Sequence, residues 1–162
     1  TTRPPRPGEV NGQDYFFVSR ENFQERIDRG EFVEWVENYG QFYGTSQKTM
    51  DAFLDSGYDL IMDIEPRGAK AIRQHYPHGV FVFILPPSVD DLIARLAGRG
   101  ESAAVMECRL RKAKDEIREA MWYDYVVLNE RLEAAVDRFR AIYIAEKSRG
   151  ERYAEQIAAF LT

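Results

Sequence analysis

The sequence is poor in cysteine and histidine. Cys108 is the single cysteine among 162 residues, so no disulfide can form within the chain, and we expect a cytoplasmic protein. His75 and His78 are the only histidines, which leaves too few ligands for a zinc site of the cysteine–histidine type. The sequence therefore predicts neither a disulfide framework nor a structural metal.

Long hydrophobic runs and an excess of positive charge are also missing. No apolar run approaches the roughly 18 residues that a membrane-spanning helix needs, and no signal peptide is visible. The formal net charge is -5, whereas general nucleic-acid binders usually carry a basic surplus. We therefore expect neither a membrane nor a nucleic acid as a partner.

The chain does contain enough apolar material for a core. Hydrophobic residues make up 44% and aromatic residues 13% of the sequence, which suits one domain or one core with inserted lobes. Apolar runs at residues 58–65, 79–87 and 123–129 alternate with helical patterns. This alternation is typical of buried parallel strands, so the predicted fold class is α/β.

Local signals predict helices between these runs. Ser19 can cap a helix over residues 21–29 that Gly30 ends, and Pro66 suits the first turn of a helix over residues 67–75. Ser88 and Asp91 form a capping-box pattern before "VDDLIARLAG". Further predicted elements are helices at 47–56, 103–120 and in parts of 130–162, and a hairpin turn at Asn11-Gly12 before a strand at 15–18.

The first stretch, "TTRPPRPGEVNGQDYFFVS", holds two arginines between prolines. The prolines favour a polyproline II conformation with three residues per turn, so Arg3 and Arg6 are predicted to point the same way, roughly 9 Å apart. Guanidinium groups suit phosphate oxygens, so this pair is a candidate phosphate site. The alternative is a solvated proline-rich arm.

Two tyrosines are further candidates for phosphate binding. Tyr15 and Tyr43 each carry a hydroxyl that can donate to a phosphate, although buried tyrosines more often serve the core. Tyr43 precedes Gly44, where the backbone can approach a ligand closely, and the Thr45 hydroxyl is adjacent.

Three carboxylates are candidates for ligand recognition. Asp63 and Glu65 lie two apart at the end of an apolar run and therefore share one face, where they favour a cation or donor groups. The alternative is that Asp63 and Glu65 are an acidic pair that stabilises the start of the next helix.

Glu34 lies among apolar residues and needs hydrogen-bond donors, which an arginine or the N–H and NH₂ edge of guanine would supply. Adenine presents an acceptor at N1, so a site of this kind rejects it.

The charged segment 90–120 lies between two predicted core strands. It is either a mobile lid or a solvated helical hairpin. Arg95 and Arg99 lie four apart on one predicted helix face, and Arg109 and Arg111 follow on the next helix. Arginines on a mobile segment can neutralise charge on a transferring phosphoryl group, and otherwise they pair with surface carboxylates.

Five stretches, in this order and spacing, resemble guanylate kinase. They are "TTRPPRPGEVNGQDYFFVS", "FVEWVENYGQFYGTS", "LIMDIEPRGAKAIR", "FILPPSVDDLIARLAGRG" and "YDYVVLNE", and the resemblance covers roughly residues 1–147. It implies a P-loop kinase-like parallel sheet core flanked by helices, with a mixed α+β GMP-binding lobe and a helical lid. It also implies transfer of the γ-phosphoryl group of ATP to GMP with Mg²⁺, by a monomer or homodimer.

The resemblance assigns roles residue by residue. Arg3, Arg6, Tyr15 and Tyr43 match positions that hold the GMP phosphate, while Glu34, Thr45 and Glu65 match positions that read guanine; Glu9, Gly44 and Gly68 complete the predicted GMP site. Asp63 matches an acidic position near the phosphates and metal. Arg95, Arg99 and Arg109 match lid arginines, and Asn129 and Arg95 fall on the ATP side. The implied division is a GMP-binding lobe at 1–48, core at 49–89, a lid at 90–120, and core with a C-terminal helix at 121–162.

The chain departs from the family pattern in several places. The phosphate loop of the GxxxxGK[ST] kind is absent from the 162 residues, and we expect it upstream of Thr1, so that this chain by itself can be inactive. Glu65 stands where an aspartate is usual, and the stretch from Gly100 to Arg109 is one residue short, which makes Arg111 the alternative lid arginine. The alternative function is a guanylate-kinase-like module that binds phosphopeptides without catalysis.

Overall fold

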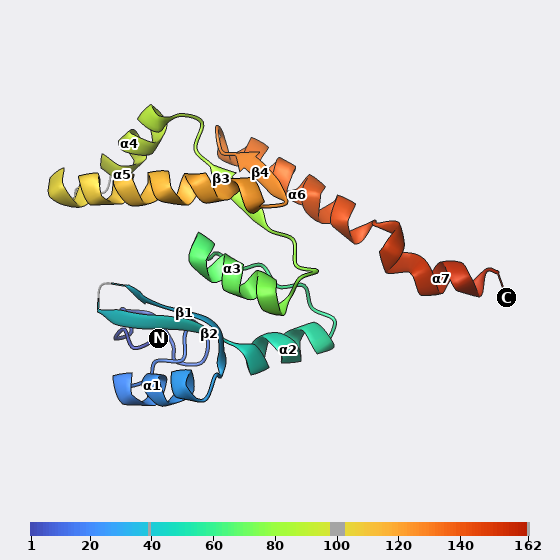
Figure 1. Cartoon of the computed structure of the whole chain (residues 1–162), viewed down its shortest axis with the longest axis horizontal. Coiled ribbons are helices and arrows are strands. Elements are labelled where there is room, and N and C mark those ends of the chain that lie inside the picture. Colours follow the sequence, from blue (N-terminus) through green and yellow to red (C-terminus); the bar gives the residue numbers. More distant parts are fainter. Residues whose placement is uncertain (39, 98–102, 162) are drawn as a thin grey trace. The chain divides into compact units, whose positions relative to one another are not determined.

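The computed structural model describes residues 1–38, 40–97 and 103–161 (Figure 1). The chain divides into two compact units, Thr1–Gly79 and Val80–Thr162. The predicted core segment 49–89 spans the boundary between these units, and the predicted division into lobe, core and lid remains a prediction. In the part of the chain that the structure describes, no helix is long and apolar enough to cross a membrane.

The first unit is built on a β-hairpin with helices around it. Strands β1 (Phe32–Asn38) and β2 (Gln41–Ser46) pair antiparallel. The helices of this unit are α1 (Arg20–Asp28), α2 (Gln47–Asp55) and α3 (Pro66–His75). All three helices confirm the sequence prediction to within one residue at each end.

Side-chain caps explain where these helices begin. The Ser19 hydroxyl accepts a hydrogen bond from the Asn22 N–H at 3.2 Å, and Gly30, with φ of 67°, follows the end of α1. The Ser46 hydroxyl accepts from the Thr49 N–H at 3.4 Å at the start of α2. Pro66 occupies the first turn of α3, where its missing N–H costs no hydrogen bond.

An aromatic core joins α1 to one face of the hairpin. Phe23 is 1% exposed and stacks on Phe32, with ring centroids 4.4 Å apart, and on Phe42 at 5.4 Å. A Cβ added to Gly44 would lie 3.0 Å from both Phe23 and Phe32. The absence of a side chain at Gly44 therefore lets the aromatic rings pack closely against β2.

The N-terminal segment pairs with the beginning of β2. Thr2 donates its N–H to the Phe42 carbonyl at 2.9 Å, and its hydroxyl accepts from the Phe42 N–H at 2.8 Å. The predicted strand at 15–18 is wrong: Tyr15 makes only an isolated bridge with Asn11. The N–H of Phe17 bonds the Asn11 side chain and that of Val18 bonds the Thr1 carbonyl, so these donors do not form a continuous ladder.

The second unit contains a parallel strand pair and long helices. Strands β3 (Val82–Leu85) and β4 (Tyr125–Leu128) pair in parallel, with Val82 opposite Tyr125. The helices are α4 (Val89–Ala97), α5 (Ala103–Arg118), α6 (Leu132–Lys147) and α7 (Ala154–Ala159), with 3₁₀ turns at Glu119–Trp122 and Gly150–Tyr153. Strands at 79–87 and 123–129 and the α/β class are thus confirmed.

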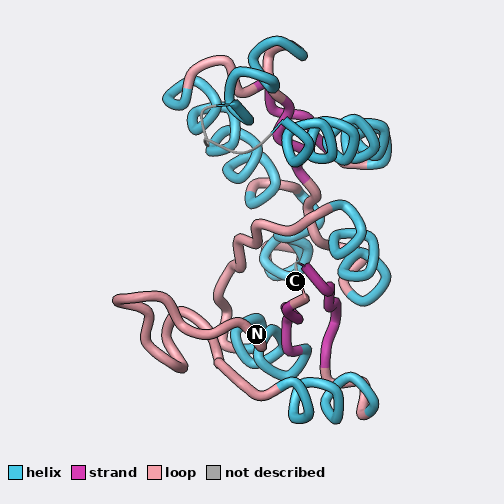
Figure 2. The backbone as a smooth tube through the Cα atoms, turned by 90° about the vertical axis from the view of Figure 1, so that its left-hand side faces the viewer, coloured by secondary structure: helices cyan, strands magenta, loops and turns pink. Residues whose placement is uncertain are grey.

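The predicted strand at 58–65 is not present. Residues 58–65 form no strand, and Figure 2 draws the connection between α2 and α3 as a loop. Ile61 is 77% exposed. Among the described residues, β3 pairs with β4 and with no other strand, so this apolar run has no ladder to join, and a strand without a partner is not stable.

Candidate functional site

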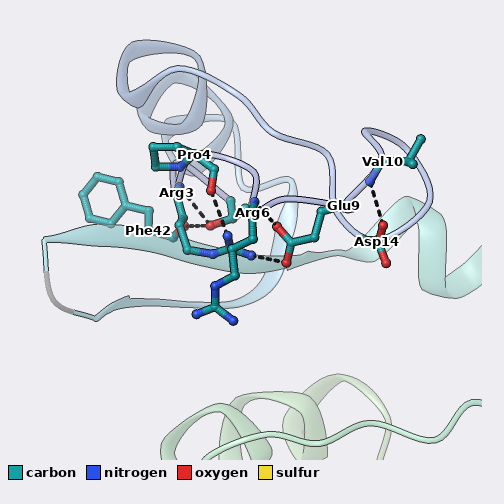
Figure 3. A network of polar contacts seen from close by, with 8 residues as sticks. Arg3, Pro4, Arg6, Glu9, Val10, Asp14 and Phe42 are labelled. Carbon is teal, nitrogen blue, oxygen red and sulfur yellow. Dashed lines mark hydrogen bonds and ion pairs between the residues drawn. The ribbon is translucent and has the colours of Figure 1, made fainter.

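Arg3 is held by several neighbours at once (Figure 3). Its Nη2 donates to Glu9 Oε1 at 2.8 Å and its Nη1 donates to the Pro4 carbonyl at 2.8 Å. The guanidinium carbon lies 5.5 Å from the centroid of the Tyr15 ring and 5.7 Å from that of Phe17. The Arg3 side chain is only 13% exposed. These contacts fix the guanidinium group in one place.

A tight turn connects the two arginines to Glu9. The Glu9 N–H donates to the Arg6 carbonyl at 3.0 Å, and Gly8 has φ of 91°. This is the pattern of a type II turn, with Pro7 and Gly8 at its centre. Glu9 Oε2 also accepts from the Arg6 N–H at 2.7 Å. A carboxylate and a turn therefore hold the arm in addition to its prolines.

The Arg6 side chain extends away from this network. Arg6 is exposed, and Figure 3 shows its guanidinium group pointing away from Glu9. Among the residues that the structure describes, this guanidinium group has no hydrogen-bond or ion-pair partner. Arg6 therefore offers all of its side-chain donors to a ligand.

The Arg3–Glu9 contact shifts the titration of both groups. The hydrogen bond from Arg3 lowers the pKa of the Glu9 carboxyl, and the Arg6 N–H contributes in the same direction. The same bond raises the pKa of the Arg3 guanidinium, with smaller contributions from Tyr43. Both side chains are consequently charged at neutral pH.

The two candidate tyrosines meet beside Arg3. The rings of Tyr15 and Tyr43 lie edge to face with centroids 6.4 Å apart. Tyr15 is 43% exposed, and Tyr43 is partly exposed. The structure thus brings Arg3, Glu9, Tyr15 and Tyr43 into one cluster, as a phosphate site requires.

Glu34 and Thr45 form a second cluster, on the hairpin. The Thr45 hydroxyl donates to Glu34 Oε1 at 2.7 Å, and the two residues are register partners. A β-bulge lies between Phe32 and Glu34, so Val33 is an extra residue of β1. Because of it, Phe32 faces α1 while Glu34 lies on the other face of the hairpin. Without the bulge, the two side chains would share a face.

Gly68 lies against the Glu34 carboxylate. A Cβ added to Gly68 would be 3.1 Å from Glu34 Oε2. The absence of a side chain at position 68 therefore lets the first turn of α3 approach this carboxylate without displacing it.

The two clusters share one face of β2. Tyr43 and Thr45 alternate with Phe42 and Gly44, which face α1, and are therefore on the opposite side. Two residues of a strand span about 7 Å, so the Thr45–Glu34 pair and the Tyr43–Arg3 group are about one nucleoside apart. Gly44 has a packing role on the α1 face, and its predicted role in ligand approach remains a prediction.

Asp63 and Glu65 lie in the segment before α3. Exposure alternates along residues 61–67, with Asp63 and Glu65 both exposed and the intervening Ile64 partly buried. This agrees with side chains on the same side of an extended chain. Glu65 is the N-cap residue of α3, and its carbonyl accepts from the Ala69 N–H at 3.0 Å.

The remaining candidates lie in the second unit. Arg95 Nη2 donates to the Asn129 carbonyl at 2.8 Å, which brings two predicted ATP-side residues together. Arg109 is partly buried, whereas Arg111 is exposed and pairs with Glu107 at 3.7 Å. Arg99 lies outside the described residues.

Asn11, predicted only as a turn residue, and Asp14, which the sequence analysis did not single out, hold the loop that carries Tyr15. Asn11 Oδ1 accepts from the Phe17 N–H at 2.9 Å, and Asp14 Oδ2 accepts from the Val10 N–H at 2.7 Å. The Asn-Gly turn signal indicated a hairpin there, but Asn and Asp side chains equally often accept hydrogen bonds from backbone N–H groups in turns.

A cavity of about 550 Å³ beside α1 and α2 contains none of the predicted site residues.

Together with the α/β fold, these side chains fit the class of nucleotide-binding phosphotransferases, in which arginines and hydroxyl groups hold phosphates. The guanylate kinase family model matches residues 1–146. The chain belongs to the guanylate kinase family.

Individual relatives agree with this assignment. The chain is 57% identical over 161 residues to a guanylate kinase of Syntrophus aciditrophicus, covering 99% of this chain and 78% of the relative. It is 44% identical over 158 residues to one of Geobacter metallireducens, covering 97% and 78%. The crystal structure of guanylate kinase from Anaplasma phagocytophilum superposes with a TM-score of 0.73 at 35% identity, covering 91% of this chain and 73% of that one. These matches give no support to the alternative of a non-catalytic phosphopeptide-binding module.

Proposed function

We propose that this protein transfers the γ-phosphoryl group of ATP to GMP, giving ADP and GDP. The observation that carries the proposal is the shared face of β2. There, Glu34 bonded to Thr45 lies about 7 Å along the strand from Tyr43 and its neighbour Arg3. This spacing suits a base at one end and a phosphate at the other.

The Glu34 end explains guanine selectivity. Guanine presents the N1 hydrogen and the 2-amino group side by side, and one carboxylate can accept both hydrogen bonds. Thr45 donates to Oε1 and thereby orients the carboxylate. Adenine has an acceptor at N1, which would leave a partly buried carboxylate oxygen of Glu34 without a donor. Glu65 and Gly68, at the start of α3, border the same end.

The Arg3 end suits the monophosphate. The proposed ligands of the phosphate are the guanidinium groups of Arg3 and Arg6 and the hydroxyls of Tyr15 and Tyr43. Arg6 is exposed, and its guanidinium group has no partner among the described residues, so it can turn these donors to a phosphate without breaking another side-chain bond. Glu9 belongs to the same loop.

The proposed transfer uses charge stabilisation and needs no protein nucleophile. Arg95, Arg99 and Arg109 are proposed to neutralise the transferring phosphoryl group, and Asn129 to border ATP. Mg²⁺ bound to nucleotide phosphates usually takes only one or two protein carboxylates. Asp63 fits this need because it is exposed and makes no ion pair with another described residue. A bound Mg²⁺ would neutralise negative charge on the nucleotide phosphates.

The ATP half of the proposal rests on family membership. The 162 residues contain no GxxxxGK[ST] motif, and the chain covers 78% of the length of the Syntrophus relative. Phosphoryl transfer is measured as GMP-dependent formation of ADP from ATP. Formation of ADP with AMP at the same rate would contradict the proposal.

GMP recognition can be tested with this chain alone. Calorimetric titration should show GMP binding much more tightly than AMP. Glu34→Gln should weaken GMP binding about 10- to 100-fold, because its amide NH₂ would face a guanine donor. Glu37→Gln is the matched control, because Glu37 lies on the same strand as Glu34 and forms an exposed ion pair with Arg20 of α1. Equal affinity for GMP and AMP would overturn the proposal.

We further propose that the protein acts in purine nucleotide metabolism in the cytoplasm, as a monomer or homodimer and without a nucleic-acid or membrane partner. The family assignment supports this role. Gel filtration with light scattering would measure the oligomeric state.

A further inference from the structure

We propose that Glu9 is a positioning residue of the phosphate site: it holds Arg3 and Arg6 for the substrate and acts through them. This inference rests on the proposed function, because it assumes that the two arginines bind the GMP phosphate. It gives Glu9 a role that its type alone does not suggest, since a carboxylate beside a phosphate site is electrostatically unfavourable.

Both oxygens of Glu9 are already bonded. Oε1 accepts from Arg3 Nη2 at 2.8 Å and Oε2 accepts from the Arg6 N–H at 2.7 Å (Figure 3). The type II turn, closed by the Glu9 N–H on the Arg6 carbonyl at 3.0 Å, sets the distance between these two partners. One carboxylate therefore connects the side chain of the first arginine to the backbone of the second.

The contact between Glu9 and Arg3 restricts the rotamers of the Arg3 side chain before the phosphate binds. Arginine has a long side chain with many rotamers, and a donor held in place before binding loses less entropy when the ligand arrives. Glu9 and the Pro4 carbonyl take one hydrogen bond from each terminal nitrogen of Arg3. Because a guanidinium group has five N–H donors, three remain for other acceptors.

A purely electrostatic role and a positioning role of Glu9 predict opposite effects of Glu9→Gln on GMP affinity. If Glu9 only added negative charge near the site, Glu9→Gln would remove repulsion and tighten GMP binding. If Glu9 positions the arginines, Glu9→Gln would weaken GMP binding, because glutamine has a single acceptor oxygen and can keep only one of the two contacts to Arg3 and the Arg6 N–H. The sign of the change therefore separates the two explanations.

The experiment is a calorimetric titration of GMP and guanosine into the 162-residue chain and its variants. Glu9→Gln should weaken GMP binding about tenfold or more, because Arg3 would then lose more conformational entropy on binding the phosphate, and should leave guanosine binding unchanged. Glu9→Asp should also weaken GMP binding, because its shorter side chain keeps the charge but cannot reach both partners. Glu37→Gln should change neither affinity.

A double-mutant cycle tests whether Glu9 acts through Arg3. In an Arg3→Ala background, the effect of Glu9→Gln on GMP binding should shrink to less than half; an undiminished effect would show that Glu9 does not act through Arg3 and would overturn the proposal. Unchanged or tighter GMP binding by Glu9→Gln would also overturn it. If Glu9→Gln loses its folded circular dichroism spectrum, Glu9→Asp carries the same test. Failure of the unsubstituted chain to bind GMP would instead overturn the proposed function.

Discussion

At the scale of single residues, the site depends on two glycines whose missing Cβ atoms allow close contacts. Gly44 and Gly68 lie at close approaches on opposite sides of the structure around β2. A Cβ at Gly44 would meet aromatic rings of the core, whereas a Cβ at Gly68 would meet the carboxylate of Glu34. The same residue type thus serves packing at one position and access to a functional group at the other.

Gly68→Ala should separate stability from binding. The added Cβ, 3.1 Å from Glu34 Oε2, should displace the carboxylate and weaken GMP binding several-fold. Alanine is the better helix former, so the free energy of unfolding should fall little, or rise by up to about 1 kcal/mol. Calorimetry with GMP and urea unfolding measure the two effects. Unchanged GMP affinity would contradict this view of Gly68.

The charge of Glu146 should contribute to stability in a way that is lost in acid. It is 8% exposed, accepts from the Tyr125 hydroxyl at 2.5 Å and from Arg149 Nη1 at 3.2 Å. The Tyr125 hydrogen bond, followed by Arg149, lowers the pKa of Glu146 below its usual value of 4.5. The stabilisation is therefore present above pH 4.5 and is lost as the pH falls through the lower pKa of the folded state.

Glu146→Ala should reduce the free energy of unfolding at pH 7 by about 1–3 kcal/mol, because the Tyr125 hydroxyl loses its buried acceptor. The loss should shrink as the pH falls below 4.5, which urea unfolding at several pH values would measure. Glu151→Ala is a control, since the Glu151 side chain is 74% exposed in its pair with Arg149. A pH-independent loss would contradict the pKa argument.

At the scale of elements, caps and turns decide where helices begin, and one irregularity decides which side chains share a face. The bulge at Val33 leaves Phe32 in the α1 core and Glu34 beside Thr45 and Gly68. A sequence analysis that assumes strict alternation would place Phe32 and Glu34 together. Register is a property of two strands, so neither strand alone predicts the bulge.

Ser19→Ala should destabilise the first unit by about 1 kcal/mol. Its hydroxyl accepts from the Asn22 N–H at the start of α1, the helix that supplies Phe23 to the core. Ser56→Ala is the matched control, because the Ser56 hydroxyl donates to the Ala52 carbonyl and caps no N–H group. Urea unfolding measures both variants, and equal losses would contradict a capping role for Ser19.

At the scale of the whole molecule, a chain with a net charge of -5 is proposed to bind an anion. The local attraction of Arg3 and Arg6 for the phosphate must then outweigh the repulsion by the net negative charge. Salt screens this attraction, so the salt dependence of binding tests it. GMP binding should weaken several-fold between about 50 and 500 mM salt, whereas guanosine binding should change little. Calorimetry at both ionic strengths measures this, and equal salt dependence for GMP and guanosine would contradict a charged phosphate site.

The sequence by itself determined the features that depend on neighbouring residues. Ser19, Pro66 and the Ser88–Asp91 pair mark helix starts because capping involves groups within one turn. The motifs also sufficed to predict the family that the comparisons confirmed.

Only the tertiary structure decided features that depend on distant partners. Residues 58–65 have the composition of a strand, but a strand exists only where another strand completes its hydrogen bonds, and none of the described strands does. Glu34 meets Thr45 and Gly68 because a hairpin register and a helix start bring them together across the chain. Helix caps and turns depend on residues that are close in the sequence. Strand pairing and side-chain packing depend on contacts between residues that are far apart in the sequence.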